Sequence, residues 1–199
     1  QNEGQNVVIN GDYAKTNAYN YSFDGSFEVV GNNRYTGAET LTFENIKFET
    51  SRDGVYFINS NSQEAPGRYS HNITVKNCTF KGENDYTTVG ARFRQAYNIK
   101  FENCEVQRMH SLLQAPSISG VTVDHVNIKN SKNGLNFNNS NNVVVSYCTA
   151  EVKGYAVRFG EGSSDTTAET YTIENSTLKS SCDEADDAVI ILRGSAANA

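Results

Sequence analysis

Polar side chains suited to ligand binding recur at a fixed interval through the middle of the chain. Arg92, Gln114, Asn136 and Arg158 follow one another every 22 residues, in a column that also takes in Tyr56 before them and Ile190 after them. Arginine presents a planar fork of donors to a carboxylate or sulfate, and the amides of Asn and Gln pair with hydroxyl groups. The ligand that this column favours is an extended chain rich in hydroxyl or carboxylate groups.

A second column lies two residues further along each repeat. It reads Ile58, Arg94, Pro116, Asn138, Gly160 and Leu192. We expect Arg94 and Asn138 to add donors beside the first column, because side chains two apart on a strand share a face. The alternative stays open that both columns form a solvated sheet face whose polar residues only prevent aggregation.

Catalytic groups are not evident at these columns. Glycoside hydrolysis needs two carboxylates that face one bond across about 5–9 Å. The acidic residues near the columns are assigned to turns: Asp53, Glu83, Asp85, Asp183, Glu184, Asp186 and Asp187. His110, at a turn near Arg108 and Lys132, is the best general-base candidate.

The sequence predicts no metal and no cofactor. Zinc sites use closely spaced Cys and His pairs, and none occurs here. The acidic stretch 182–187 has oxygen ligands of the kind that calcium prefers, although such turns are commonly just solvated.

The columns are positioned by a repeat. Segments 99–120 and 121–142 align with their apolar residues in register, and similar segments start at Leu41, Ile73, Val143 and Tyr171, with a poorer copy at Val7. Short runs of period-two alternation, rich in Val, Ile, Phe and Thr, indicate strands. Self-similarity at this period is typical of stacked repeats, here with two inward-facing strands per coil.

Two further columns fix the register. The fifth place of the coils holds Asn45, Asn77, Asn103, His125, Tyr147 and Asn175, and the sixth holds Ile46, Cys78, Cys104, Val126, Cys148 and Ser176. Asn favours turns because it tolerates left-handed backbone conformations. The sixth place should face inward, so we expect three of the four cysteines to be buried and reduced.

Insertions are expected at 59–69, 81–88, 160–167 and 180–187, on the two edges of the ligand columns. The coils between them have none. They would leave a trough about four layers, or roughly 15–20 Å, long.

Composition limits the function classes. The chain has 199 residues and a formal net charge of −6, which argues against a nucleic-acid partner. It has no apolar run long enough to span a membrane. We expect one domain, with residues 1–40 as an N-terminal coil or cap and 41–199 as the coils.

The coil pattern resembles the right-handed parallel β-helix of the pectate-lyase-like superfamily. The resemblance covers Leu41 to about Arg193. It implies a function among those of the superfamily's members, which are polysaccharide lyases, glycoside hydrolases, epimerases, phage tailspikes and adhesins. The paired aspartates and Gly-His-Gly of its polygalacturonases are absent, and so is the aspartate-rich calcium strand of its pectate lyases.

The sequence thus predicts an all-β, right-handed parallel β-helix of six to seven coils. We expect a secreted or cell-surface module that recognises a polysaccharide or glycan without catalysis. Two alternatives remain: a lyase or hydrolase acting on carbohydrate, and an adhesin shaft without a ligand.

Overall fold

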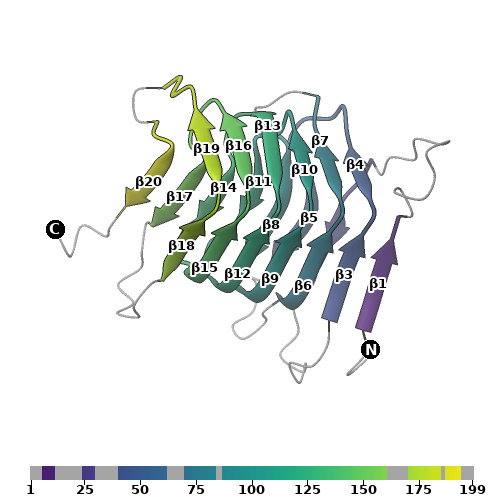
Figure 1. The fold of residues 1–199 in the computed structure, drawn as a ribbon. Helices are drawn as coiled ribbons and strands as arrows, with labels where there is room; N and C mark the ends of the chain where they lie inside the picture. Colours follow the sequence, from purple (N-terminus) through teal and green to yellow (C-terminus); the bar gives the residue numbers. More distant parts are fainter. Residues whose placement is uncertain are drawn as a thin grey trace.

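The computed structural model describes residues 6–11, 24–29, 40–61, 70–83, 87–160, 170–184 and 187–193. Every regular element in these residues is a β-strand, and the strands form three parallel sheets that run along one axis. The strands of successive coils lie side by side, from β1 at one end to β20 at the other (Figure 1). The predicted parallel β-helix is confirmed.

The first sheet, sheet A, contains the predicted coil starts. Leu41, Ile73, Ile99, Val121, Val143 and Tyr171 pair in succession, and Val7 pairs with Leu41. The register read from the repeat is therefore correct, including the poorer first copy. The strands are β1 (Asn6–Asn10), β3 (Thr40–Glu44), β6 (Ser70–Lys76), β9 (Ala96–Glu102), β12 (Ile118–Asp124), β15 (Asn141–Ser146) and β18 (Tyr171–Glu174).

Sheet B is a set of short strands that the sequence analysis did not separate from the first strand of each coil. From β3 onward, three strands per coil replace the expected two, because the chain bends sharply between sheet A and sheet B. The strands are β4 (Lys47–Glu49), β7 (Thr79–Lys81), β10 (Glu105–Gln107), β13 (Asn127–Ser131), β16 (Thr149–Val152) and β19 (Thr177–Ser180).

Sheet C carries the predicted ligand columns. Its strands are β2 (Phe27–Glu28), β5 (Tyr56–Asn61), β8 (Val89–Arg94), β11 (Ser111–Gln114), β14 (Leu135–Phe137), β17 (Val157–Gly160) and β20 (Ile190–Arg193). The insertions at 81–88 and 180–187 lie between sheet B and sheet C, and those at 59–69 and 160–167 lie between sheet C and sheet A. Residues 62–69, 84–86, 161–167 and 185–186 of these insertions fall outside the described ranges.

The bend between sheet A and sheet B is made by one residue in the left-handed region. It is the residue of the fifth place: Asn45 (φ 55°), Asn77 (53°), Asn103 (52°), His125 (50°), Tyr147 (50°) and Asn175 (49°). Asn visits this region more readily than most side chains. The amides also bond from layer to layer, since Asn103 Nδ2 donates to Asn77 Oδ1 at 3.4 Å. The asparagine column is therefore a corner, as its residue type predicted.

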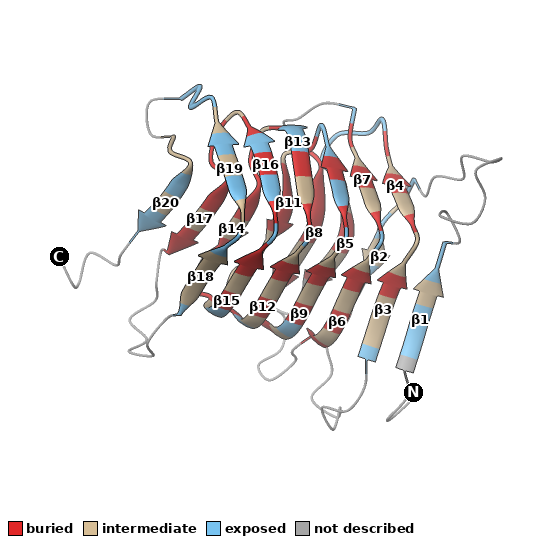
Figure 2. Ribbon diagram, viewed as in Figure 1, coloured by how far each residue is buried: buried red, intermediate tan, exposed pale blue. Residues whose placement is uncertain are grey.

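The side chains that point inward form one continuous core. Cys104, Val126, Phe137 and Phe159 are each at most 2% exposed. Rings stack between layers, with Phe48 on Phe80 at 4.8 Å and Phe137 on Phe159 at 5.5 Å between centroids. Burial alternates along the strands, and red positions recur in the layers between the two ends of the β-helix (Figure 2). Each fully buried large side chain contributes about 1.5–3 kcal/mol to folding.

Candidate ligand-binding face

Sheet C brings the central polar residues into one row. Arg92 pairs with Gln114, Gln114 with Asn136, and Asn136 with Arg158. All four side chains are half-buried, so part of each is accessible from outside. Strands in a sheet lie about 4.8 Å apart, which sets the two arginines about 14 Å from one another. These four residues are called the polar row below.

The N-terminal end of the predicted column is wrong in register. Asn59, not Tyr56, pairs with Arg92, and Tyr56 pairs with Val89. Phe57 and Ile58 are both fully buried, so strict alternation fails in β5 and the next polar side chain to face outward is Asn59. Ile58 was also expected in the second column, but Asn61 occupies that place beside Arg94.

Tyr56 nevertheless contacts Arg92. The guanidinium carbon of Arg92 lies 4.3 Å from the centre of the Tyr56 ring, and Arg92 Nε donates to Asn59 Oδ1 at 3.2 Å. A cation over an aromatic face is attracted by the ring quadrupole. Two contacts therefore hold this guanidinium in place, and its terminal nitrogens are not needed for either of them.

The far end of the row also pairs an arginine with a tyrosine. Burial raises the pKa of the Tyr155 hydroxyl, and the neighbouring Arg158, which is within hydrogen-bonding reach, partly opposes that rise. Tyr155 is 8% exposed and lies two residues before the start of β17. Tyr155 is not among the residues predicted from the sequence; the signal that points to it is an aromatic residue three positions before an arginine of the column.

The C-terminal end of the column is also shifted. Arg158 pairs with Ile191 rather than Ile190, and Gly160 pairs with Arg193 rather than Leu192. Insertion 180–187 precedes β20, so counting from the previous coil misplaced this strand by one residue. The row therefore ends on a half-buried apolar side chain.

Two amides of the face have an unused acceptor. The side-chain oxygens of Asn136 and Asn138 are buried and have no hydrogen-bond partner within the described residues. A buried acceptor without a partner costs about 1–3 kcal/mol. A donor that reached either oxygen would therefore be favoured. Arg94, from the same second column, ends β8 and is half-buried.

The acidic residues of the turns serve the turns themselves. Asp53 accepts a bond from Thr87 Oγ1 at 3.0 Å, and Glu184 lies 3.2 Å from Lys132 Nζ. Asp187 accepts from the backbone of Glu184 at 3.0 Å. Asp85 and Asp186 fall outside the described ranges. Within the described part of the chain, no group of three His, Cys, Asp or Glu could hold a metal.

His110 lies at the turn between β10 and β11, where its backbone joins two neighbouring coils. Burial lowers its pKa, and the positive charge of Lys132 lowers it further. Its Nδ1 is 3.3 Å from Ser111 Oγ. The imidazole is therefore neutral near pH 7, as a general base must be, but no contact of His110 with the polar row is seen in the described residues.

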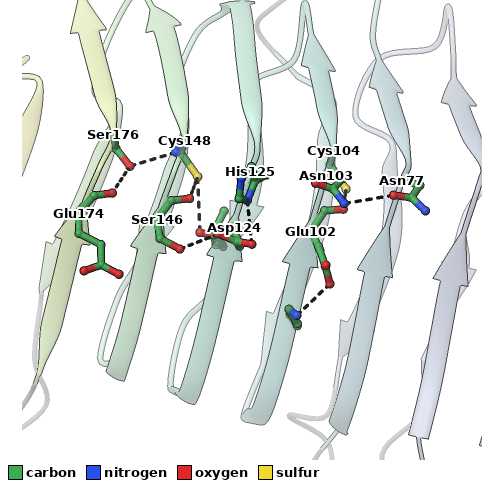
Figure 3. A network of polar contacts seen from close by, with 12 residues as sticks. Asn77, Glu102, Asn103, Cys104, Asp124, His125, Ser146, Cys148, Glu174 and Ser176 are labelled. Carbon is green, nitrogen blue, oxygen red and sulfur yellow. Dashed lines mark hydrogen bonds and ion pairs between the residues drawn. The ribbon is translucent and has the colours of Figure 1, made fainter.

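A separate polar network follows the corner between sheets A and B (Figure 3). His125 Nδ1 is 2.9 Å from Asp124 Oδ2, and Ser146 Oγ donates to Asp124 Oδ1 at 2.8 Å. Both bonds lower the pKa of Asp124, the one from His125 most. The imidazole also stacks on the Tyr147 ring at 4.9 Å. These contacts join residues of two adjacent coils, so their role is to fix the register of the layers.

The cysteines next to this corner are free and buried, as predicted for Cys78, Cys104 and Cys148. Each thiol donates to the carbonyl two residues before it, as Cys148 does to Ser146 at 3.1 Å. Ser176 makes the same bond to Glu174 at 2.8 Å. Each of these carbonyls also accepts a backbone N–H from the preceding coil, as Ser146 does from His125 at 3.1 Å, so the thiol or hydroxyl is a second donor at the bend.

These features define a right-handed β-helix with a polar face on sheet C. The model of a family described as "Right handed beta helix region" matches residues 29–198. The chain therefore belongs to this family, which is compatible with glycan-binding and with carbohydrate-active proteins. Comparisons with curated proteins and with solved structures gave no match. The described residues include no helix long and apolar enough to cross a membrane.

Proposed function

We propose that this protein is a secreted or cell-surface module that binds a polysaccharide or glycan along sheet C. The observation that carries the proposal is the polar row itself, with a tyrosine at each arginine. Arg92 lies over Tyr56 and Arg158 lies beside Tyr155. An arginine that is already ordered loses less side-chain entropy when it binds a ligand.

The chemistry of the row favours a glycan with acidic groups. Arg92 and Arg158 provide charge-assisted donors at the two ends, and Gln114 and Asn136 provide neutral amides between them. Carboxylates or sulfates suit the ends, and sugar hydroxyls suit the middle. The separation of about three layers requires an extended ligand rather than a single sugar.

The proposal is tested with a glycan array, followed by calorimetry on the glycan that binds best. Arg92→Ala and Arg158→Ala should each weaken binding by about 1–3 kcal/mol, as expected for a charge-assisted hydrogen bond. Added salt should weaken binding as well, because exposed charges are screened.

Matched controls lie on the outer face of sheet A. Lys76 forms an ion pair with Glu44, and Glu102 forms one with Lys100, each at 2.8 Å. Both ion pairs are on a different sheet from the polar row. Lys76→Ala and Glu102→Ala should leave glycan affinity unchanged. If both arginine variants bind the glycan as tightly as the original protein does, sheet C is not the site, and a shaft without a ligand on this face is favoured.

A further inference from the structure

A hollow that described residues line lies on sheet B, on a different face from the polar row. It is a groove of about 760 Å³ beside β13, β16 and β19, and Arg108 and Glu83 also line it. A smaller hollow of about 290 Å³ shares Glu151 and Lys179 with it and continues over the same three strands. Together they form one depression across three coils, called the sheet B groove below.

Three cations gather at this groove without a partner. Arg108, Lys129 and Lys179 are exposed, and their charged side chains have no ion pair, hydrogen bond or ring contact within the described residues. Every other described lysine and arginine has at least one such contact or an electrostatic interaction with a neighbour. The unpartnered positive charge of the described structure is therefore concentrated at one place.

The same sheet also contains lysines whose charge is neutralised by a carboxylate. Near its other end, Lys47 and Lys81 both contact Glu49, at 2.8 and 2.6 Å. At the groove, Glu151 pairs in register with Lys129 and with Lys179, yet it lies within 4.0 Å of neither amine. The lysines of the groove thus remain available to an anionic ligand, although the chain as a whole has a formal net charge of −6.

Uncharged polar groups line the groove beside the cations. Asn127, Thr149 and Thr177 succeed one another in register, one in each layer. Thr149 Oγ1 donates to Asn127 Oδ1 at 2.7 Å, and Asn127 Nδ2 donates to Glu105 Oε2 at 2.9 Å. This row offers hydroxyl and amide groups at the spacing of the strands, about 4.8 Å. It suits a ligand that carries hydroxyls as well as charge.

We propose that the sheet B groove binds an anionic polysaccharide, with its carboxylate or sulfate groups on Arg108, Lys129 and Lys179. The groove residues include no aromatic side chain on which a base could stack, which favours a sugar chain over single-stranded nucleic acid. The site is on a different face from the polar row and does not rest on the function proposed there.

Calorimetry with dextran sulfate, and with uncharged dextran as its matched control, tests the charge requirement. Polygalacturonate tests carboxylate in place of sulfate. Dextran sulfate should bind, dextran should not, and the triple variant Arg108→Ala/Lys129→Ala/Lys179→Ala should weaken binding by about tenfold or more. Glu151→Gln should strengthen binding, because it removes the negative charge between two lysines.

The control variants distinguish the two faces. Lys76→Ala/Lys100→Ala removes two paired cations on sheet A and should change nothing. Arg92→Ala/Arg158→Ala should leave binding at the sheet B groove intact, whatever it does to the glycan found on sheet C. If only that pair weakens dextran sulfate binding, the anion site is on sheet C and the proposal is overturned. Tighter binding of a thymidine oligonucleotide that depends on the same three cations would overturn the ligand class.

Discussion

Arg92 rests on the ring of Tyr56, with 4.3 Å between the guanidinium carbon and the ring centre, although the two residues are not paired in the sheet. The partner of Arg92 in the sheet is Asn59. Tyr56 belongs to the same coil as Asn59, three positions before it, and its ring reaches Arg92 from there. The contact therefore joins two layers of the β-helix at one end of the polar row. Its energetic value can be measured separately from that of Arg92 itself.

Tyr56→Leu should weaken glycan binding by about 0.5–1 kcal/mol, because it removes the aromatic face that holds Arg92. Tyr56→Phe keeps that face and should bind like the original protein. Calorimetry with the glycan identified on the array measures both variants. Equal loss in both would assign the effect to the hydroxyl group instead of the ring.

Asn103 provides a test of the corner between sheets A and B. Its φ of 52° is costly for a residue other than Gly or Asn, so Asn103→Ala should lower the free energy of unfolding by about 1–2 kcal/mol. Asn103→Gly has the required backbone freedom and should lose less. Urea denaturation compares the two. A larger loss for Gly than for Ala would show that backbone strain at this corner is unimportant.

The repeat allowed sheet A to be predicted residue by residue, because apolar side chains in register can stack in only one way. The polar row was also correct where coils have equal length. The errors occur at Tyr56 and Ile190, where insertions precede or follow the strand and counting from the neighbouring coil fails. The division of each first strand into two was missed, although the asparagine column marks the place of the bend.

Other features depend on geometry that the sequence does not state. The position of Tyr155 beside Arg158 follows from the turn before β17, and no periodic pattern encodes that turn. The sheet B groove depends on which lysines find a carboxylate within reach. Lys81 does and Lys129 does not, although both occupy the same column of sheet B.

The buried thiols predict a loss of stability in alkaline solution. Burial raises the pKa of Cys78 to about 11 and that of Cys104 to about 12, from the usual 9.0. Because the folded state holds these protons more tightly, their contribution to stability is complete below about pH 9 and is lost as the pH rises toward the folded values. The free energy of unfolding should fall by about 1.4 kcal/mol per pH unit for each thiol.

Urea denaturation at several pH values between about 8 and 11 measures this effect. The variant Cys78→Ala/Cys104→Ala should lose less stability over that range than the original protein does, whatever its stability at pH 8. Identical pH profiles would contradict the prediction. Thiol titration at neutral pH gives a second measurement, in which the exposed Cys182 should react and the three buried cysteines should react only in denaturant.

Val126 tests the core. It is 1% exposed, and Val126→Asp would place an unpaired charge where water cannot reach it. The variant should fail to fold or should melt far below the original protein in thermal circular dichroism. Thr122→Asp, on the outward side of β12 and half-buried, is the control and should melt within a few degrees of the original protein. A native-like melting temperature for Val126→Asp would mean that this position is not interior.

From Asn45 to Asn175, the corner between sheets A and B is one left-handed residue in every coil, and each of the four insertions occurs at one of the other two corners. The corner between sheets A and B is thus a spine of constant length, and the two corners that hold the insertions are margins where the chain can be longer. A longer loop at a margin leaves the winding of its neighbours unchanged, because the corner between sheets A and B keeps its length and the three sheets continue past the loop. Both margins border sheet C, so the walls around the polar row can be exchanged for others while the row itself stays in place.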